Sequence, residues 1–353
     1  ASQVVYGNES EVLPEHLNGL GYMNILYLLL QIEINKQNFL KNGKDINILL
    51  IEEPEAHTHP QMQYIFSREI KKMLSDVLSL QTLISTHSSQ IVSQSNFEDL
   101  RYMYLDDCRD VIIKNFHSEL KVEYKDEFEN FKFVEQYLNI QSSELFFSSK
   151  VIFVEGITEN MLLPYFIDRF DKAKLELDPE YIPLGSQNIS IMEVGANAKV
   201  FSPLLNFLGI KTLVITDIDT TKPNNNNRYE ACTVSDGVHT SNSTIKYFYD
   251  APSDIHSDDY KGWLDNLKNG NLKTINRVVN VSYQKKENGY HARSFEDAFI
   301  NVNKELLESN SSRLMGLKNV DQLKEGKDIY EITQNIIDKK SDFSSSILYL
   351  ALS

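Results

Sequence analysis

Four carboxylates stand at two places in this sequence where they could do chemistry together. Glu155 and Glu159 flank a turn at Gly156, and Asp217 and Asp219 form an Asp-x-Asp pair. Residues two apart on an extended strand end share one face, so the two aspartates are expected to point the same way. No Lys or Arg lies immediately beside these acids in the sequence. Their charges would repel one another, and hard divalent cations such as Mg²⁺ or Mn²⁺ relieve such repulsion.

Short β-branched apolar runs must position these acids. Residues 151–154 and 211–216 each have the pattern of a buried parallel strand that ends at the acids. The carboxyl ends of the strands form the ligand-binding edge of an open parallel sheet, so both acid pairs are expected at that edge. Helices over about 159–170 and 199–208, with a strand over 189–194, complete a β-α-β-α-β order with right-handed crossovers. The expected fold class is α/β, with a small parallel sheet flanked by helices.

The two strand ends together resemble the Toprim domain, the metal-binding fold of topoisomerases, primases and a group of nucleases. In that family a Glu after the first strand and an Asp-x-Asp pair after a later strand hold the metal, which corresponds to Glu155, Asp217 and Asp219. The Glu-Gly-x-x-Glu spacing that adds Glu159 resembles the nuclease branch. A lone Asp-x-Asp would more often be a solvated loop, and it is the pair of strand ends that favours a metal site.

The amino-terminal third carries a second motif. Residues 45–53 have the pattern of a buried strand ending in Glu52 and Glu53, and a strand over 81–85 is followed by His87. This order resembles the distal half of an ABC-type ATPase. The resemblance implies that Glu52 helps to hold Mg²⁺, that Glu53 activates the attacking water, and that His87 is the switch histidine that contacts the γ-phosphate.

Two further segments fit the same resemblance. Residues 54–60 match the D-loop, and Asn18, Gly19 and Gly21 stand where the ABC signature sequence lies, at the start of a helix expected over 22–33. In that family the glycine amides of the signature face a phosphate presented by a partner subunit. The alternative for Asn18-Gly19 is a simple turn before the helix.

One part of an ABC-type ATPase is missing from the sequence. No Gly-x-x-x-x-Gly-Lys-[Ser/Thr] phosphate loop occurs in the 353 residues. An ABC-type ATPase places that loop well before the signature, so we expect this chain to be a carboxy-terminal portion of a longer protein. ATP is therefore expected as a cofactor of the full-length protein only.

Composition describes an ordinary globular protein, with 41% hydrophobic and 24% charged residues. The net charge of −15 argues against nucleic-acid binding by bulk electrostatics, although a local basic groove or a metal-bridged phosphate contact stays open. The two cysteines, Cys108 and Cys232, cannot form a disulfide framework and suit a reducing cytoplasm. No signal peptide and no apolar run long enough to span a bilayer is found, so no membrane partner is expected.

The carboxy-terminal part offers further candidates. Ser294 and Asp297 form a Ser-x-x-Asp capping box at the start of a helix, which leaves Glu296 for another role. Lys339 and Lys340 precede a Ser-Asp-Phe sequence and could be merely a polar helix terminus.

Three regions are expected: residues 1–118 as the ATPase half, 119–147 as a helical connector, and 148–353 as the Toprim domain. An insertion at about 220–290 is rich in Asn, Ser and Asp, and such a loop beside a site usually serves substrate access or is partly disordered.

An ABC-type half followed directly by a Toprim domain resembles the OLD family (overcoming lysogenisation defect) of ATP-dependent endonucleases. That family includes the nuclease subunit of the Gabija antiphage system and some retron-associated effectors. The resemblance implies that Glu296 joins the metal cluster with Glu159, and that Lys340 assists at the scissile phosphate, with Lys339 as its rival. The core metal ligands would be Glu155, Asp217 and Asp219.

The mechanism implied by the resemblance is two-metal hydrolysis of a phosphodiester bond in DNA, controlled by the ATPase half. It further implies a cytoplasmic homodimer that cuts double-stranded DNA in antiphage defence, with a partner protein or nucleic acid of the defence system as a further expectation. Two alternatives are weighed against it. The first is a topoisomerase- or primase-like enzyme, against which the sequence has no nearby domain with a Tyr nucleophile and no zinc-ribbon cysteines. The second is a non-catalytic scaffold that would use the ABC half for dimerisation only.

Overall fold

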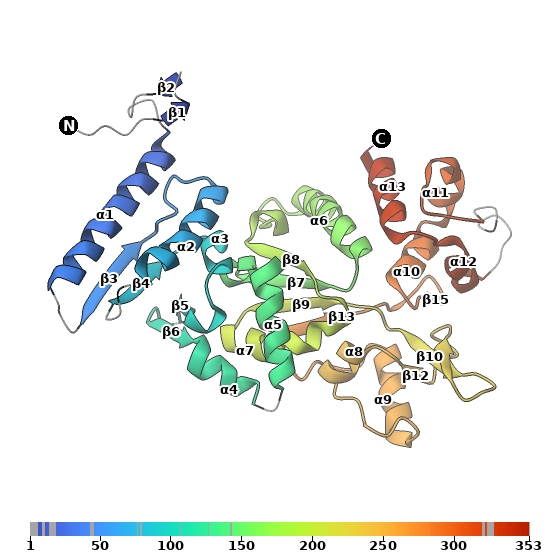
Figure 1. The fold of residues 1–353 in the computed structure, drawn as a ribbon. Coiled ribbons are helices and arrows are strands. Elements are labelled where there is room, and N and C mark those ends of the chain that lie inside the picture. Colours follow the sequence, from blue (N-terminus) through green and yellow to red (C-terminus); the bar gives the residue numbers. More distant parts are fainter. Residues whose placement is uncertain are drawn as a thin grey trace. The chain divides into compact units, whose positions relative to one another are not determined.

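The computed structural model describes residues 6–8, 11–13, 19–42, 46–75, 77, 80–106, 108–125, 127–141, 143–319, 322 and 328–352. Asn18 of the predicted signature lies outside these residues. The chain divides into two compact units, Ala1–Phe147 and Ser148–Ser353 (Figure 1). The three regions expected from the sequence stay a prediction, and the boundary at residue 148 coincides with the start of the second unit.

The first unit is built on a small parallel sheet. β3 (Asn47–Glu52) pairs in parallel with β4 (Leu80–Ser85), and α2 (Pro60–Leu74) is the crossover between them. Buried and exposed residues alternate along β3, as period-two side-chain geometry requires. Its buried side chains pack into one core with α2 and with α1 (Leu20–Asn42), which is longer than the helix expected over 22–33.

The other face of this sheet is apolar and open. Ile48 and Leu50 of β3 are 55% and 67% exposed, and Leu83 of β4 is also exposed. The buried face of this two-stranded sheet packs against α1 and α2.

The rest of the first unit is a hairpin followed by helices. β5 (Arg101–Leu105) and β6 (Val111–Asn115) pair antiparallel. A cluster of buried aromatic rings joins this hairpin region to the predicted connector through Phe97, Phe116, Phe131 and Phe146. The remaining elements are β1 (Tyr6–Asn8), β2 (Glu11–Leu13), α3 (Ser89–Ser93), η2 (Phe97–Asp99), η3 (Phe116–Leu120), α4 (Lys121–Glu123), α5 (Phe128–Gln141) and η4 (Ser143–Phe147).

The second unit has a four-stranded parallel sheet in the order β13-β9-β7-β8. β7 (Lys150–Val154), β8 (Ile189–Glu193) and β9 (Lys211–Ile215) lie where the sequence predicts them. α6 (Ile157–Leu177) follows β7, while η6 (Gly195–Phe201) and α7 (Ser202–Leu208) follow β8. Phe153 of β7 packs edge-on against Phe201, which places η6 on one face of the sheet.

The segment 220–290 is a folded subdomain rather than the irregular loop that its composition suggests. Its strand β13 (Val279–Ser282) joins the sheet beside β9, so the sequence-based description of the segment as a loop does not hold for this part of it. The reason is that its apolar residues are spread among Asn and Ser, and they meet only in three dimensions. The other elements are β10 (Thr220–Pro223), β11 (Tyr229–Ala231), β12 (His239–Thr240), α8 (Ser243–Phe248), α9 (Asp258–Lys268), β14 (Lys286–Glu287) and β15 (Tyr290–His291).

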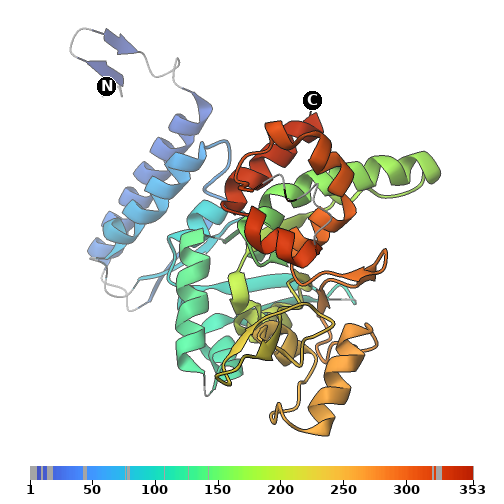
Figure 2. The same ribbon diagram turned by 90° about the vertical axis from the view of Figure 1, so that its right-hand side faces the viewer.

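A helical cluster ends the chain. α10 (Phe295–Val302), α11 (Lys304–Ser309), α12 (Ile329–Ile336) and α13 (Lys340–Leu352) share one apolar core with Leu162 of α6, and η7 (Ser311–Arg313) lies between α11 and α12 in the chain. Figure 2 shows these helices, in orange and red, beside α6 in green. Among the described residues, no helix combines the length and the apolar character needed to cross a membrane.

Candidate active site at the carboxyl edge of the sheet

The parallel register decides which residues meet at one edge of the sheet. β7, β9 and β13 are aligned so that their carboxyl ends lie side by side. Glu155 follows β7, Asp217 and Asp219 follow β9, and Gln284 follows β13. The predicted metal ligands therefore come from neighbouring strand ends, as the sequence indicates.

Glu155 links the ends of β7 and β9. Its Oε2 accepts a hydrogen bond from Thr216 Oγ1 at 2.5 Å and one from the backbone N–H of Asp217 at 3.2 Å. One carboxylate oxygen thus has two donors, which fixes the distance between the two strand ends.

Asp217 lies at the centre of the site and is only 9% exposed. Its Oδ1 accepts hydrogen bonds from Gln284 Nε2 at 2.6 Å and from the backbone N–H of Phe295 at 2.8 Å. Burial, followed by the neighbouring carboxylates of Glu155 and Asp219, raises the pKa of Asp217 well above its usual value. A buried carboxylate among like charges is a group that a cation would stabilise.

Asp219 is held by a cation of the chain itself. Its Oδ1 lies 2.7 Å from Arg293 Nη2, and Arg293 Nε also donates to the carbonyl of Thr220 at 3.1 Å. Burial raises the pKa of Asp219 and outweighs the opposing effect of Arg293. The expectation that no Lys or Arg pairs with these acids is therefore wrong, because Arg293 reaches the site from a distant part of the sequence.

Glu296 and Glu159 form the second half of the site. Glu296 is 3% exposed, and its Oε1 lies 2.8 Å from Lys340 Nζ and accepts a hydrogen bond from Thr158 Oγ1 at 3.0 Å. Glu159 is also buried. Burial raises the pKa of Glu159, and the nearby charge of Glu296 adds to the effect.

Lys340 and its rival Lys339 have different surroundings. Burial lowers the pKa of Lys340, but the carboxylates of Glu296, Asp217 and Glu159 outweigh burial, so that the pKa is raised and the amine stays charged. Lys339 Nζ lies 3.9 Å from Asp342 at the surface instead. The geometry thus directs Lys340, not Lys339, toward the acids.

The donor set fits a hard divalent cation, because it consists of carboxylates that burial and mutual repulsion disfavour as free anions. Among the described residues, however, no three His, Cys, Asp or Glu side chains are gathered closely enough to hold one ion. The reason is visible in the contacts, since Asp219 is paired with Arg293 and Glu296 with Lys340. Metal binding would require these acids to exchange a side-chain cation for the ion.

The ATPase motif is a smaller constellation in the first unit. Glu53 has a left-handed backbone with φ of 40° directly after β3, and its Oε1 lies 3.5 Å from His87 Nε2. The backbone N–H of His87 donates to Glu55 Oε1 at 2.5 Å. The structure therefore brings the predicted catalytic Glu and switch His together. Glu52 ends β3 beside them and is exposed.

The predicted signature glycines lie at the start of α1. Gly19 is exposed, whereas Gly21 faces the D-loop so closely that an added Cβ would meet the His57 carbonyl. Asn24 Nδ2 donates to the carbonyl of Ala56 at 3.2 Å in the same contact. The signature helix and the D-loop are thus packed together.

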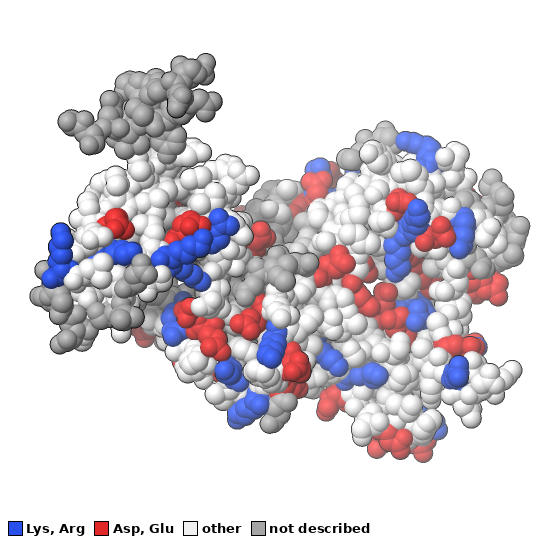
Figure 3. Space-filling view, in the orientation of Figure 1, with Lys and Arg blue, Asp and Glu red and all other residues white. Residues whose placement is uncertain are grey.

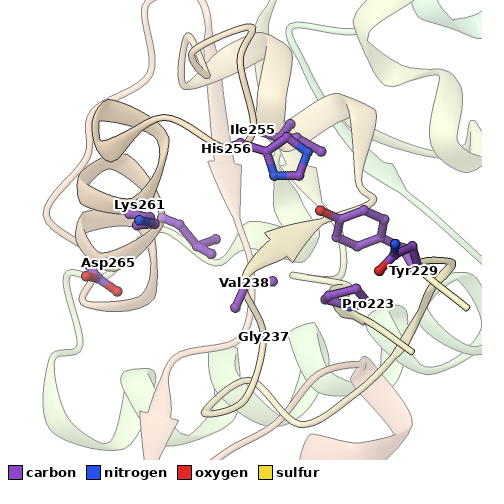
Figure 4. A pocket seen from close by; sticks show the side chains of 10 residues that line it. Pro223, Tyr229, Gly237, Val238, Ile255, His256, Lys261 and Asp265 are labelled. Carbon is purple, nitrogen blue, oxygen red and sulfur yellow. The ribbon is translucent and has the colours of Figure 1, made fainter. Parts of the chain in front are cut away.

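A cavity of about 780 Å³ lies away from the acids, in the subdomain 220–290 (Figure 4). Tyr229, His256, Lys261 and Asp265 are among its lining side chains, and none of the predicted site residues lines it.

Sequence reasoning missed the polar residues that hold the acids in place. Thr216, Asn242, Gln284 and Arg293 all contact the Asp217–Asp219 turn or its partners. Asn242 could have been noticed as an N-cap before an apolar helix. The other three carry no local pattern.

Two family models match the chain. The model described as "AAA ATPase domain" matches residues 2–92, and the model described as "Overcoming lysogenization defect protein-like, TOPRIM domain" matches residues 146–219. The α/β fold class, with an ATPase segment followed by a Toprim domain, is thereby confirmed.

Several nucleases are similar in sequence. Endonuclease GajA of Bacillus cereus (strain HuB5-5) is 30% identical over 96% of this chain and 50% of its own length. The OLD nuclease of Thermus scotoductus is 26% identical over 51% of this chain and 32% of its own length. The Old nuclease of Escherichia phage P2 is 29% identical over 53% of this chain and 30% of its own length. The chain thus spans about half the length of the first relative and about a third of the other two.

Proposed function

Since this chain matches the OLD family of ATPase–Toprim proteins in the identity and order of its two segments, we propose that it carries the cleavage site of a metal-dependent DNA endonuclease. The carrying observation is that Glu155, Asp217 and Asp219 follow neighbouring strand ends at the carboxyl edge of a parallel sheet, inside the segment that resembles the Toprim family. The names of the similar proteins support a nuclease.

In this proposal Glu155, Asp217 and Asp219 are the core metal ligands, and Glu159 and Glu296 serve a second ion. Bound Mg²⁺ or Mn²⁺ would supply Lewis-acid polarisation of a phosphate oxygen and an activated water. The carboxylates bind and orient, and the buried position of Asp217 limits the water around them.

Lys340 has a separate part. Its amine keeps its proton because three carboxylates surround it, so it is a positive charge at a fixed place in the site. We propose that it neutralises charge that develops on the scissile phosphate. Its present partner Glu296 would then turn to the metal.

DNA recognition is proposed to be local. The face shown in Figure 3 has acidic and basic side chains interspersed over the described residues of each unit, without a broad basic area. With a net charge of −15, contact through bound metal and Lys340 is a better route to phosphate than bulk attraction. Double-stranded DNA is the proposed substrate.

The first unit is proposed to act on nucleotide only with the phosphate loop of the longer protein. Glu52, Glu53 and His87 would then form the hydrolytic part of the site, and the signature at Gly19 and Gly21 would face a partner subunit. A homodimer, a cytoplasmic location and a role in antiphage defence, with a partner of the defence system, follow from the family likeness and are part of the proposal.

The test is cleavage of supercoiled plasmid in Mg²⁺ or Mn²⁺ by the chain and by a protein extended to full length. Glu155→Ala and Asp217→Ala are compared with Asp236→Ala, a matched control whose carboxylate pairs with Lys222 away from the acids. We expect cleavage to be lost in the first two variants and kept in the control. Cleavage that survives Asp217→Ala would overturn the assignment. Absence of both metal binding and cleavage in either protein would favour the scaffold, and a covalent DNA–protein adduct would favour a topoisomerase-like enzyme.

A further inference from the structure

Every backbone N–H and C=O group of the Asp217–Asp219 turn makes a hydrogen bond, and most of the partners lie in the subdomain 220–290. The carbonyl of Asp217 accepts from Asn242 Nδ2 at 2.8 Å, and the carbonyl of Ile218 accepts from Thr240 Oγ1 at 2.6 Å. The N–H of Ile218 donates to Gln284 Oε1 at 2.9 Å. The remaining contacts are Asp217 N to Glu155 Oε2 at 3.2 Å, Asp219 N to the Arg293 carbonyl at 3.4 Å, and Ser241 N to the Asp219 carbonyl at 3.0 Å.

The middle residue of the turn is anchored in the same segment. Ile218 is fully buried in a core formed with Val234, Ile245, Trp263 and other residues of the subdomain 220–290. An apolar side chain between two carboxylates thus points away from the site and into the subdomain. Burying this side chain stabilises the turn relative to an exposed position.

Gln284 uses both ends of its amide on the turn. Its Oε1 accepts from the backbone of Ile218, and its Nε2 donates to Asp217 Oδ1 at 2.6 Å. The Gln284 carbonyl contacts His291 Nε2 at 2.9 Å, which fixes the glutamine's own backbone. One side chain therefore sets both the turn and the carboxylate orientation.

Asn242 is a second amide side chain that supports the turn, and it is buried. Its Oδ1 caps α8 by accepting from Thr244 and Ile245, and its Nδ2 donates to Thr216 Oγ1 at 2.7 Å as well as to the Asp217 carbonyl. All hydrogen-bonding capacity of this amide is used. The start of α8 is thereby tied to the end of β9.

The turn needs such support because Asp219 has a left-handed backbone, with φ of 49°. That conformation is unfavourable for a residue other than Gly, although Asp tolerates it better than most. A free strand end would relax out of it, and Asp219 would leave the face that Asp217 occupies.

We propose that the subdomain 220–290 is an integral part of the catalytic domain that builds the Asp217–Asp219 turn, with Gln284 and Asn242 as positioning residues. The subdomain lies outside the part matched by the Toprim family model, which ends at residue 219. The inference rests on the proposed function in one respect, which is that the turn is taken to be a metal site. The hydrogen bonds that support the turn are present in the metal-free protein and do not depend on that function.

The test reads the turn directly, by hydrogen exchange at the Ile218 amide in the metal-free chain. Gln284→Ala removes the acceptor, and we expect exchange at Ile218 to become at least about tenfold faster. Gln284→Met keeps most of the side-chain length but has neither the acceptor nor the donor of the amide, so we expect exchange at Ile218 to be as fast as in Gln284→Ala. Asn276→Ala is the matched control, because its amide bonds Ser202 and the amides at the start of β13, the end opposite the site.

Mn²⁺ affinity, followed by the electron paramagnetic resonance of the free ion, is the second readout. We expect Gln284→Ala to weaken binding about 10- to 100-fold, as loss of a ligand-orienting partner does, while Asn276→Ala leaves it unchanged. Unchanged exchange at Ile218 in Gln284→Ala, or equal acceleration in Asn276→Ala, would overturn the inference. A parent chain that binds no Mn²⁺ would count against the proposed function, and the exchange result would still decide this inference.

Discussion

Removing the charge of Lys340 should destabilise the metal-free protein through Glu296, and divalent metal should reduce that loss. The amine lies 2.8 Å from a carboxylate that is 3% exposed, while the lysine side chain itself is 56% exposed. Glu296 would be left in a buried place, where Thr158 Oγ1 still donates a hydrogen bond to its carboxylate. A bound cation would take over the role of the amine.

The size of the effect follows from this asymmetric burial. Two unit charges at 2.8 Å attract by about 6 kcal/mol at an effective dielectric constant of 20 and by about 1.5 kcal/mol in bulk water. Ordering of the exposed lysine and desolvation of the glutamate offset most of the larger value. We therefore expect a net coupling free energy between Lys340 and Glu296 of about 1–2 kcal/mol, which lies between the values for exposed and for buried ion pairs.

A double-mutant cycle measures this coupling. Lys340→Met, Glu296→Gln and the double variant are unfolded by urea in EDTA, and the free energies of unfolding are compared with those in Mn²⁺. The Lys340→Met loss should fall to within about 0.5 kcal/mol of zero in the Glu296→Gln background and should shrink when metal is added. Lys339→Met is the matched control, since its amine lies at the surface 3.9 Å from Asp342.

Two results would refute the reasoning. An equal loss from Lys340→Met with and without Glu296 would mean that the lysine stabilises the fold by packing, not by its charge. A loss that metal leaves unchanged would mean that the ion does not compete with Lys340 for Glu296.

Three further predictions concern single sites. Asp217→Asn should raise the melting temperature of the metal-free protein at pH 8: the folded-state pKa of Asp217 is raised by burial and by Glu155, so its carboxyl destabilises the fold progressively as pH rises through that pKa. The advantage of the variant should fade toward pH 4, and parallel melting profiles across this range would contradict the prediction. Phe343→Ala should cost about 3–5 kcal/mol in urea unfolding, because the ring is fully buried where α13 begins, whereas Tyr349→Ala on the exposed face should cost less than about 0.5 kcal/mol. Gly21→Ala should destabilise the first unit by about 1–3 kcal/mol, because its methyl group would collide with the D-loop backbone, and Gly19→Ala, with open space around it, should show no such loss in thermal unfolding.

The sheet and its acids were predictable because their signals are local. A β-branched run followed by a carboxylate marks a strand end wherever it occurs, so Glu155 and the Asp217–Asp219 pair could be placed at one edge from the sequence. The capping box of Ser294 and Asp297 is also local, and the structure has Ser294 accepting from the Asp297 amide at 3.3 Å.

The supporting residues could not be predicted because their partners are remote. Arg293 lies 74 positions after Asp219 (293 − 219), and Gln284 reaches Asp217 only because β13 adds itself beside β9. β13 is short, and its Val residues alternate with Asn and Ser, which gives a weak strand signal in a polar segment. Assigning 220–290 as a loop followed from composition, and composition does not reveal a core assembled from scattered side chains.

The open apolar face of β3 and β4 has a practical consequence for anyone who purifies this chain. An exposed apolar patch on the first unit is formed by Ile48, Leu50 and Leu83. Such patches promote self-association at the concentrations used for size-exclusion chromatography and crystallisation. A dimer peak from this chain could therefore arise from that patch or from a functional dimer interface. Leu50→Lys separates the two cases, because a charge in the patch would prevent self-association through it and would leave a dimer interface elsewhere intact.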